Sequence, residues 1–355
     1  MNRDDLLKTV YFDFPAHIPV IFHINQSCWD HYPRNFLVKQ IEKHKTLFPE
    51  GVPDFAYNNV PVPYASWCRQ GERWTDPWGC VWETAMSGII GAVTEHPLPN
   101  WDKFSSYIPP DYMKITHWYP VEWVPGDIPK GGSIGFFDCL RSGEIGHGHT
   151  VLKLFDILGY QQTILELYDG SSEIQQLLEM IEEFNVGLVH QFVNTAEVKW
   201  LGYAEDLGMQ QGPLLSPEIF RNYILPSYKR LMAEADRKDV IIHMHSDGDL
   251  TALIDDILSL PLQVLNLQDT VHGLDWLADN IKGKKAIDLD IDRVLLNRET
   301  SLGRVREYLE SIVKTLFSPE GGLMLTYGLY PGVPEEIVCV LMDTLEEIAL
   351  AERQR

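Results

Sequence analysis

Helical stretches alternate with short β-like runs from about residue 150 onward, and this alternation restricts the fold more than any other feature. The β-like runs cover residues 198–206, 240–247, 263–269, 285–292 and 322–329. Each is followed by a loop and a further helical pattern, as in residues 216–238. Strands that alternate with helices at this spacing indicate βα units around a parallel sheet.

The side chains within these runs follow a period of two, with one apolar and one polar face. The polar faces carry His243, His245, Asp247, Asn266, Gln268, Asp288, Asp290 and Asp292, and a similar run near the N-terminus, residues 20–25, carries His23 and Asn25. An open sheet covered by helices on both sides favours strands that are apolar throughout. A closed barrel instead packs outward residues on helices and gathers inward residues at an active-site mouth. The pattern therefore favours an α/β fold of the closed (β/α) barrel type, while the length alone allows one large barrel or two modest domains.

The first 140 residues are rich in aromatic side chains and broken by prolines. Short strands, turns and irregular segments fit this composition better than long helices. We expect this irregular, aromatic-rich N-terminal portion to wall a pocket. Its candidate pocket residues are His23, Trp29, Trp78 and Trp82, joined from later in the chain by Tyr203, Tyr327 and Tyr330. Large aromatic side chains are also common in cores, so a core role is the alternative for each.

Charge and cysteine content narrow the partners and the compartment. The chain has 51 acidic and 29 basic residues, a formal net charge of −22. This charge repels nucleic acid and anionic membranes, and neither is expected as a partner. Five scattered cysteines form no C-x-x-C pair, no run approaches 18 apolar residues, and no leader is evident. The expected location is a reducing compartment, the cytoplasm.

The segment IIHMHSDGD, residues 241–249, raises the main chemical question. His243, His245 and Asp247 share one face of a strand, which fits a metal site, an acid/base site or a hydrogen-bond network. Glu205 and Asp206 close the preceding strand, and only one of them can face the mouth. Parity with Tyr203 favours Glu205, although Asp206 stays open.

His245, Asp247 and Glu205 form the best metal candidate. One imidazole and two carboxylates leave a fourth zinc position for a substrate atom. In the alternative, His245 only bonds to Asp247 and the following turn, while Asp249 caps the next helix. His243 is either a second nitrogen ligand or a buried, satisfied histidine.

Each of three further features has one functional and one structural interpretation. The ladder of Asp288, Asp290 and Asp292 places three carboxylates on one face, and their repulsion can raise the pKa of one of them and supply a general acid at Asp288. The alternative is that Asp292 pairs with Arg293 or with a nearby lysine. His147 and His149 in the HGH segment are a possible ligand pair or an exposed loop. Asp76 in TDPWGCVW is a substrate contact or the first residue of a D-P turn.

Several stretches also resemble a known family. Residues 203–231, the HSDGD of 245–249 and YGLYPGVPEEIV of 327–338 resemble the uroporphyrinogen decarboxylase superfamily, as do residues 17–32 and DPWGCVW with HPLPNW. The resemblance implies a single (β/α)8 TIM barrel domain over residues 1–355, in agreement with the alternation. It also places Asp76 where decarboxylases present a pyrrole-binding aspartate. Those decarboxylases carry an arginine-rich segment after the first strand, whereas here HINQSCWDHY has no arginine before Arg34. The segment therefore lacks the cationic clamps that a substrate with eight carboxylates needs.

The other activity implied by the resemblance is corrinoid-dependent methyl transfer. Thiol-activating members hold zinc with an H-x-C motif and a later cysteine, and here His245, Asp247 and the neighbourhood of Leu329 align with those positions. Both cysteines are missing, which disfavours thiol methylation. Relatives acting on methyl ethers or methylated amines are similar and need no cysteine ligands.

We therefore predict a methyltransferase component of an anaerobic corrinoid system. It would move a methyl group between an O- or N-methylated small molecule and cobalamin carried by a partner corrinoid protein. Zinc held by His245, Glu205 and Asp247 would assist, with Asp288 as a further catalytic residue. The substrate contacts would be His23, Trp29, Asp76, Trp78, Tyr203, His243, Asn266 and Tyr327, and a homodimer is possible. The alternatives are a metal-independent decarboxylase or lyase and a non-catalytic ligand-binding barrel.

Overall fold

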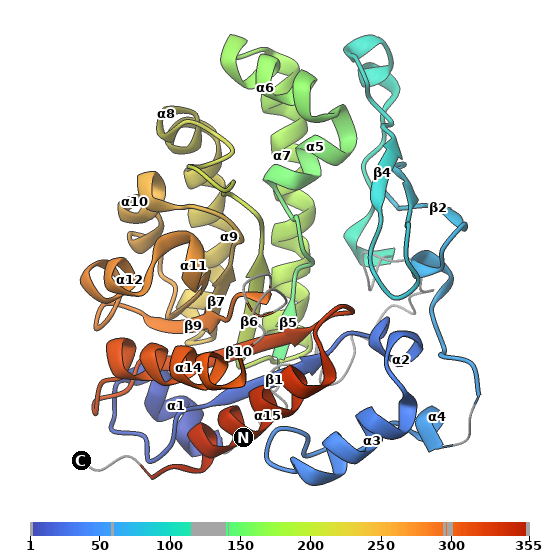
Figure 1. Cartoon of the computed structure of the whole chain (residues 1–355). Helices are drawn as coiled ribbons and strands as arrows, with labels where there is room; N and C mark the ends of the chain where they lie inside the picture. Colours follow the sequence, from blue (N-terminus) through green and yellow to red (C-terminus); the bar gives the residue numbers. More distant parts are fainter. Residues whose placement is uncertain are drawn as a thin grey trace. The chain divides into compact units, whose positions relative to one another are not determined.

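The computed structural model describes residues 3–57, 60–114, 140, 142–293, 296 and 301–352. The chain forms two compact units (Figure 1). Unit 1 comprises Met1–Arg69, Met86–Ile89 and Val264–Arg355, and unit 2 comprises Gln70–Ala85 and Ile90–Gln263. The single domain over residues 1–355 stays a prediction.

Unit 1 is built on four parallel strands in the order β1-β10-β9-β8. These are β1 (Val20–Ile24), β10 (Leu323–Leu329), β9 (Ala286–Asp290) and β8 (Val264–Gln268). Its helices are α1 (Arg3–Tyr11), α2 (Cys28–His31), α3 (Arg34–Lys43), α4 (Asp54–Tyr57), α11 (Asp269–His272), α12 (Leu274–Asn280), α14 (Leu302–Leu316) and α15 (Glu335–Leu350), with a 3₁₀ turn at Ser66–Cys68. The long helices α14 and α15 lie side by side (red in Figure 1).

Unit 2 contains three parallel strands in the order β7-β6-β5 and a small antiparallel sheet. The parallel strands are β5 (Ser142–Glu144), β6 (Trp200–Ala204) and β7 (Ile241–His245), and the antiparallel ones are β2 (Arg73–Thr75), β3 (Val81–Glu83) and β4 (Ala92–Glu95). Its α-helices are α5 (Val151–Leu158), α6 (Tyr160–Asp169), α7 (Ser172–His190), α8 (Pro217–Ile219), α9 (Leu225–Arg237) and α10 (Ile254–Leu258). Short 3₁₀ segments cover Trp101–Ser106, Tyr112–Lys114 and Thr251–Leu253, and π-helical turns cover Gln191–Thr195 and Phe220–Ile224.

Local sequence explains how the helices of unit 2 begin and end. The Ser171 hydroxyl accepts a hydrogen bond from the Ile174 N–H and caps α7, which buries an apolar stripe that includes Leu177 and Phe184. The single helix expected over residues 216–238 is divided by the π-helical turn before Pro226. Proline has no N–H to donate, so the regular hydrogen-bond ladder is reset at this point.

The repeated order of parallel strand and helix confirms the predicted α/β class of the TIM-barrel type. Each β-like run that we expected after residue 197 contains a parallel strand. The expected irregular N-terminal portion is also found, since its strands have only three to five residues. Residues 115–139 of this portion lie outside the described residues. None of the described helices is long and apolar enough to span a bilayer.

Candidate metal centre

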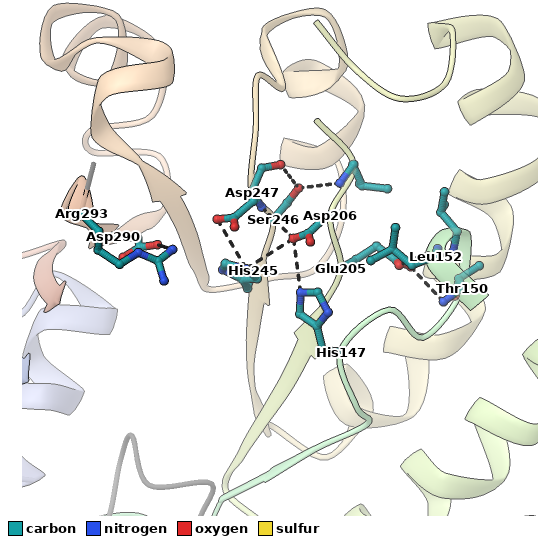
Figure 2. A network of polar contacts seen from close by, with 12 residues as sticks. His147, Thr150, Leu152, Glu205, Asp206, His245, Ser246, Asp247, Asp290 and Arg293 are labelled. Carbon is teal, nitrogen blue, oxygen red and sulfur yellow. Dashed lines mark hydrogen bonds and ion pairs between the residues drawn. The ribbon is translucent and has the colours of Figure 1, made fainter. Parts of the chain in front are cut away.

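Three side chains that follow consecutive strands of unit 2 converge on one point (Figure 2). His147 lies on the loop after β5, Asp206 lies two residues beyond β6, and His245 is the last residue of β7. Asp206 Oδ1 is 3.3 Å from His147 Nε2 and 3.6 Å from His245 Nε2. One ligand atom from each residue lies within 4.8 Å of the other two. The carboxyl ends of parallel strands meet at one edge of a sheet, which explains the convergence.

Asp247 adds a second carboxylate beside this group. Its Oδ1 lies 3.8 Å from His245 Nε2, and its backbone N–H donates to Asp206 Oδ1 at 3.2 Å. The same Oδ1 is buried and has no hydrogen-bond partner among the described residues. A buried carboxylate oxygen without a donor is unfavourable unless a cation or a ligand satisfies it.

Interactions between opposite charges shift the pKa values of the groups in this site. Burial alone would raise the pKa of the Asp206 carboxyl, but hydrogen bonds and positive charge from His147 and His245 hold that pKa well below its usual range. Burial would lower the pKa of His147, but the hydrogen bond and the charge of Asp206 outweigh it, and the pKa is raised. Asp206 therefore remains ionised and attracts positive charge to this point.

The loops that carry the two aspartates are held together by backbone contacts. Ser246 Oγ accepts from the Leu207 N–H at 2.9 Å, and the Gly208 N–H donates to the Asp247 carbonyl at 3.1 Å. A Cβ atom on Gly208 would lie 2.3 Å from the Gly248 carbonyl carbon. Only glycine permits this approach, so the HSDGD sequence fixes where Asp247 lies.

The donor set fits a zinc ion. Zinc prefers four tetrahedral ligands from nitrogen, oxygen and sulfur, and bonds of about 2.1 Å separate neighbouring ligand atoms by about 3.4 Å. The measured 3.3 and 3.6 Å at Asp206 Oδ1 lie close to this separation. His147, Asp206 and His245 would hold the ion, with Asp247 beside the fourth position.

The expected role of Glu205 as a metal ligand is not supported by the geometry. Glu205 is fully buried, and its carboxylate accepts hydrogen bonds from the start of α5, on the other side of β6 from Asp206 (Figure 2). In an alternating strand, the side chains of Glu205 and Tyr203 share one face. However, Tyr203 faces the helices, because its hydroxyl donates to the Leu231 carbonyl of α9 at 3.2 Å. Of Glu205 and Asp206, it is thus Asp206 that lies beside His245, and Tyr203 is a core residue.

The two histidines of the HGH segment have different environments. His147 is exposed, as the exposed-loop interpretation predicted, and it lies in the candidate metal centre. His149 is 1% exposed, so the expectation of an exposed loop is wrong for this residue. His243 lies one pleat below His245 and packs against Trp200, with ring centroids 5.3 Å apart. His243 is not part of the group of three.

Asp76 and Trp78 are structural parts of unit 2. The buried Asp76 carboxylate accepts from the Cys80 N–H and from Trp82 Nε1, and it lies 3.6 Å from Lys153 Nζ. These contacts fit the D-P turn rather than a substrate contact. Trp78 is 1% exposed and packs edge-on against Phe184, so it belongs to the core.

The remaining predicted site residues belong to unit 1. Asn266 Nδ2 donates to the Asp288 carbonyl, and Asp288 Oδ1 accepts from the Thr326 hydroxyl. Arg293 Nη2 lies 3.3 Å from Asp290 Oδ2, so the ladder does pair with this arginine. Three other predicted contacts are placed as follows: His23 on β1, Trp29 buried against Phe55, and Tyr327 buried against Phe22. Their expected substrate contacts, and the acid role of Asp288, stay predictions.

The fold is similar to that of a solved methyltransferase. A methyltransferase from Methanosarcina mazei matches with a TM-score of 0.62 and 14% identity over 97% of each chain. An endo-glycoceramidase II from Rhodococcus sp. matches at 13% identity with a TM-score of 0.35, over 71% of this chain and 59% of its own. No curated protein sequence matches the chain.

The family assignment rests on a sequence match. The model of the uroporphyrinogen decarboxylase (URO-D) family matches residues 155–348, more than half of the 355 residues. The match includes Asp206, His245 and Asp247 but begins after His147. The chain therefore belongs to the uroporphyrinogen decarboxylase (URO-D) family.

Proposed function

We propose that this protein is a zinc-assisted methyltransferase component of a corrinoid-dependent system. It would move a methyl group between an O- or N-methylated small molecule and a corrinoid protein. The observation that carries the proposal is the convergence of His147, Asp206 and His245 after three parallel strands. The likeness to the methyltransferase from Methanosarcina mazei supports a methyltransferase-like role.

The chemistry follows from the donor set. A bound zinc ion would supply Lewis acidity to the substrate oxygen or nitrogen that carries the methyl group. Two neutral imidazoles and one carboxylate leave the ion a net positive charge, which suits an atom that becomes negative on losing a methyl group. The imidazole and carboxylate donors also distinguish this site from thiolate sites.

The protein's own groups would position the substrate and handle the proton. Asp206 keeps its charge because both imidazoles stabilise the ionised form. Asp247 Oδ1, beside the fourth position, would accept or return a proton at the atom that gains or loses the methyl group. Zinc ligation and proton transfer would thus belong to Asp206 and Asp247, respectively.

Metal analysis and one substitution test the proposal. The purified chain, loaded with zinc and freed of excess ion, should contain about one zinc ion per chain, and His245→Ala should lose it. In a methyl-transfer assay with a methylated substrate and a corrinoid protein, His245→Ala should lower turnover by roughly 100-fold or more. His190→Ala is the matched control, because His190 is exposed on α7 of the same unit.

Three results would contradict the proposal. Unchanged methyl transfer by His245→Ala would show that the reaction does not need the assigned metal centre. A decarboxylase activity that survives chelation would favour the alternative of a metal-independent lyase. Binding of a ligand without turnover of any substrate would favour the non-catalytic barrel.

A further inference from the structure

Glu205 makes contacts that a metal ligand or an acid catalyst would not need. Its Oε2 accepts from the Thr150 N–H at 2.9 Å, the Val151 N–H at 2.9 Å and the Tyr228 hydroxyl at 3.0 Å. Its Oε1 accepts from the Leu152 N–H at 3.0 Å (Figure 2). Four donors thus satisfy a fully buried carboxylate.

Three of these donors are the unpaired N–H groups at the start of α5. A helix leaves its first N–H groups without partners inside the helix, and a carboxylate is well suited to accept from them. The side chain of Thr150, the residue before α5, makes no cap hydrogen bond. The cap comes instead from Glu205, 55 residues later in the chain.

The same contacts fix the loop that carries His147. This loop lies between β5 and α5, and His147 precedes Thr150 by three residues. The Gly148 N–H donates to the Ala204 carbonyl at 2.9 Å, and the Ile145 N–H donates to the Gly202 carbonyl at 3.2 Å. The loop is therefore bound to β6 along its length, with Glu205 as its strongest attachment.

Glu205 also determines the position of Asp206, the next residue. The Glu205 N–H donates to the His245 carbonyl at 3.0 Å, which extends the pairing of β6 with β7. With its side chain held at α5, the backbone directs Asp206 to the opposite side, toward His147 and His245. One residue thus connects all three candidate ligands.

We propose that Glu205 is a positioning residue that assembles the metal centre by holding the loop of His147 against the ends of β6 and β7. The inference rests on the proposed function, since it assigns Glu205 a role at that centre. Glu205 itself touches neither metal nor substrate. Loss of its carboxylate would let the loop move and would separate His147 Nε2 from Asp206 Oδ1.

The test measures binding of Co²⁺ alone to the metal-free full chain, by titration and by the visible absorption bands of the bound ion. Glu205→Ala should bind Co²⁺ about 10- to 100-fold more weakly, the range typical of lost groups that orient metal ligands. Its absorption bands should also change. Glu183→Ala, on the exposed face of α7, is the matched control and should bind like the wild type.

Conservative variants separate positioning from folding. Glu205→Gln keeps an oxygen for the Thr150, Val151 and Tyr228 donors but turns an amide toward the Leu152 N–H, so its affinity should fall between wild type and Glu205→Ala. Tyr228→Phe removes one donor of four and should weaken binding by less than about threefold. If Glu205→Ala does not fold, Glu205→Gln carries the test, with Glu183→Gln as its control.

Each outcome decides one point. Co²⁺ affinity and spectra in folded Glu205→Ala that equal those of Glu183→Ala would overturn the positioning role, as would Glu205→Gln that binds like Glu183→Gln. If the wild type binds no Co²⁺, the metal centre of the proposed function fails instead. In that case amide hydrogen exchange in residues 147–152 decides, and exchange in Glu205→Ala no faster than in Glu183→Ala overturns the positioning role.

Discussion

Glu205 and Asp206 are adjacent in the chain, yet their carboxylates serve opposite sides of the end of β6. Glu205 accepts from the first N–H groups of α5, whereas Asp206 lies within 3.6 Å of two imidazole nitrogens. The two carboxylates have the same chemistry, and the loops that surround them give them different partners. The difference leads to separate expectations for the two residues.

Asp206→Asn should reduce metal affinity without unfolding the chain. The amide keeps the shape of the side chain but loses the charge between His147 and His245. We expect zinc affinity to fall by roughly 100-fold or more, since loss of a supporting group alone costs about 10- to 100-fold. Competition with a chromogenic chelator would measure this. Asp255→Asn, on an exposed residue of α10, is the control. Equal affinity in the two variants would exclude Asp206 as a ligand.

His149 should make the stability of the chain sensitive to acid. Burial, followed by the charge of His147, lowers the pKa of His149 to about 3. In the unfolded chain the pKa is about 6.5, so below this pH the unfolded state binds more protons than the folded state. The free energy of unfolding should therefore fall as the pH drops, by about 1.4 kcal/mol per pH unit and about 2 kcal/mol by pH 5.

Urea denaturation of the metal-free chain between pH 7.5 and 5 would test this dependence. His149→Gln should lose stability more slowly than the wild type as the pH falls. His190→Gln changes an exposed histidine and should retain the wild-type slope. Parallel slopes for wild type and His149→Gln would show that His149 does not cause the acid sensitivity.

The sequence located the strands well because alternation is a local property. The run 240–247 contains β7, and the run 198–206 contains β6. The face of β6 that packs on helices was not predictable in the same way. Parity divides a strand into two faces but does not say which one is interior. It therefore allows Tyr203 as a site residue, whereas its buried hydroxyl donates to the Leu231 carbonyl.

The contribution of His147 was only partly predictable. Polar residues lie at the end of each of three consecutive strands: HGH after β5, Glu205 and Asp206 after β6, and His245 to Asp247 at the end of β7. This shared position is the signal that could have grouped His147 with Asp206 and His245. The different burial of His147 and His149 depends on contacts with Glu205, more than 50 residues away. Local sequence carries no information about such a contact.

Lys153→Met should destabilise unit 2. Lys153 Nζ is buried 2.9 Å from Asp156 and 3.6 Å from Asp76, and its removal leaves both carboxylates without the cation. Breaking a buried ion pair from one side costs about 3–5 kcal/mol. The loss should be smaller at pH 5 than at pH 8, because burial already raises the pKa of Asp156 and protonation removes its charge.

Urea denaturation of Lys153→Met at both pH values would measure this effect. Lys229→Met makes the same change at an exposed position on α9 and should alter stability by less than about 0.5 kcal/mol. Similar stabilities for the two variants would show that the Lys153 contacts contribute little to folding.

Gly208→Ala should disturb both stability and metal binding. The added methyl group would lie 2.3 Å from the Gly248 carbonyl carbon, so the HSDGD loop must move. Overpacking of this kind costs about 1–3 kcal/mol. Denaturation and zinc titration would measure the two effects. Gly212→Ala is the comparison variant: the added carbon has no atom within 4 Å, but Gly212 has a φ of +93°, so this variant adds backbone strain without the clash. If Gly208→Ala bound zinc as tightly as Gly212→Ala does, the position of the HSDGD loop would not affect the metal centre.

The capping of α5 by Glu205 has a consequence for the order of assembly. The attachments that bring His147, Asp206 and His245 together are hydrogen bonds within the chain, and none of them requires an ion. Folding would therefore be complete before loading, and the ion could leave and return without unfolding the chain. Occupancy would then follow the supply of free metal, so that availability of the ion could regulate this enzyme.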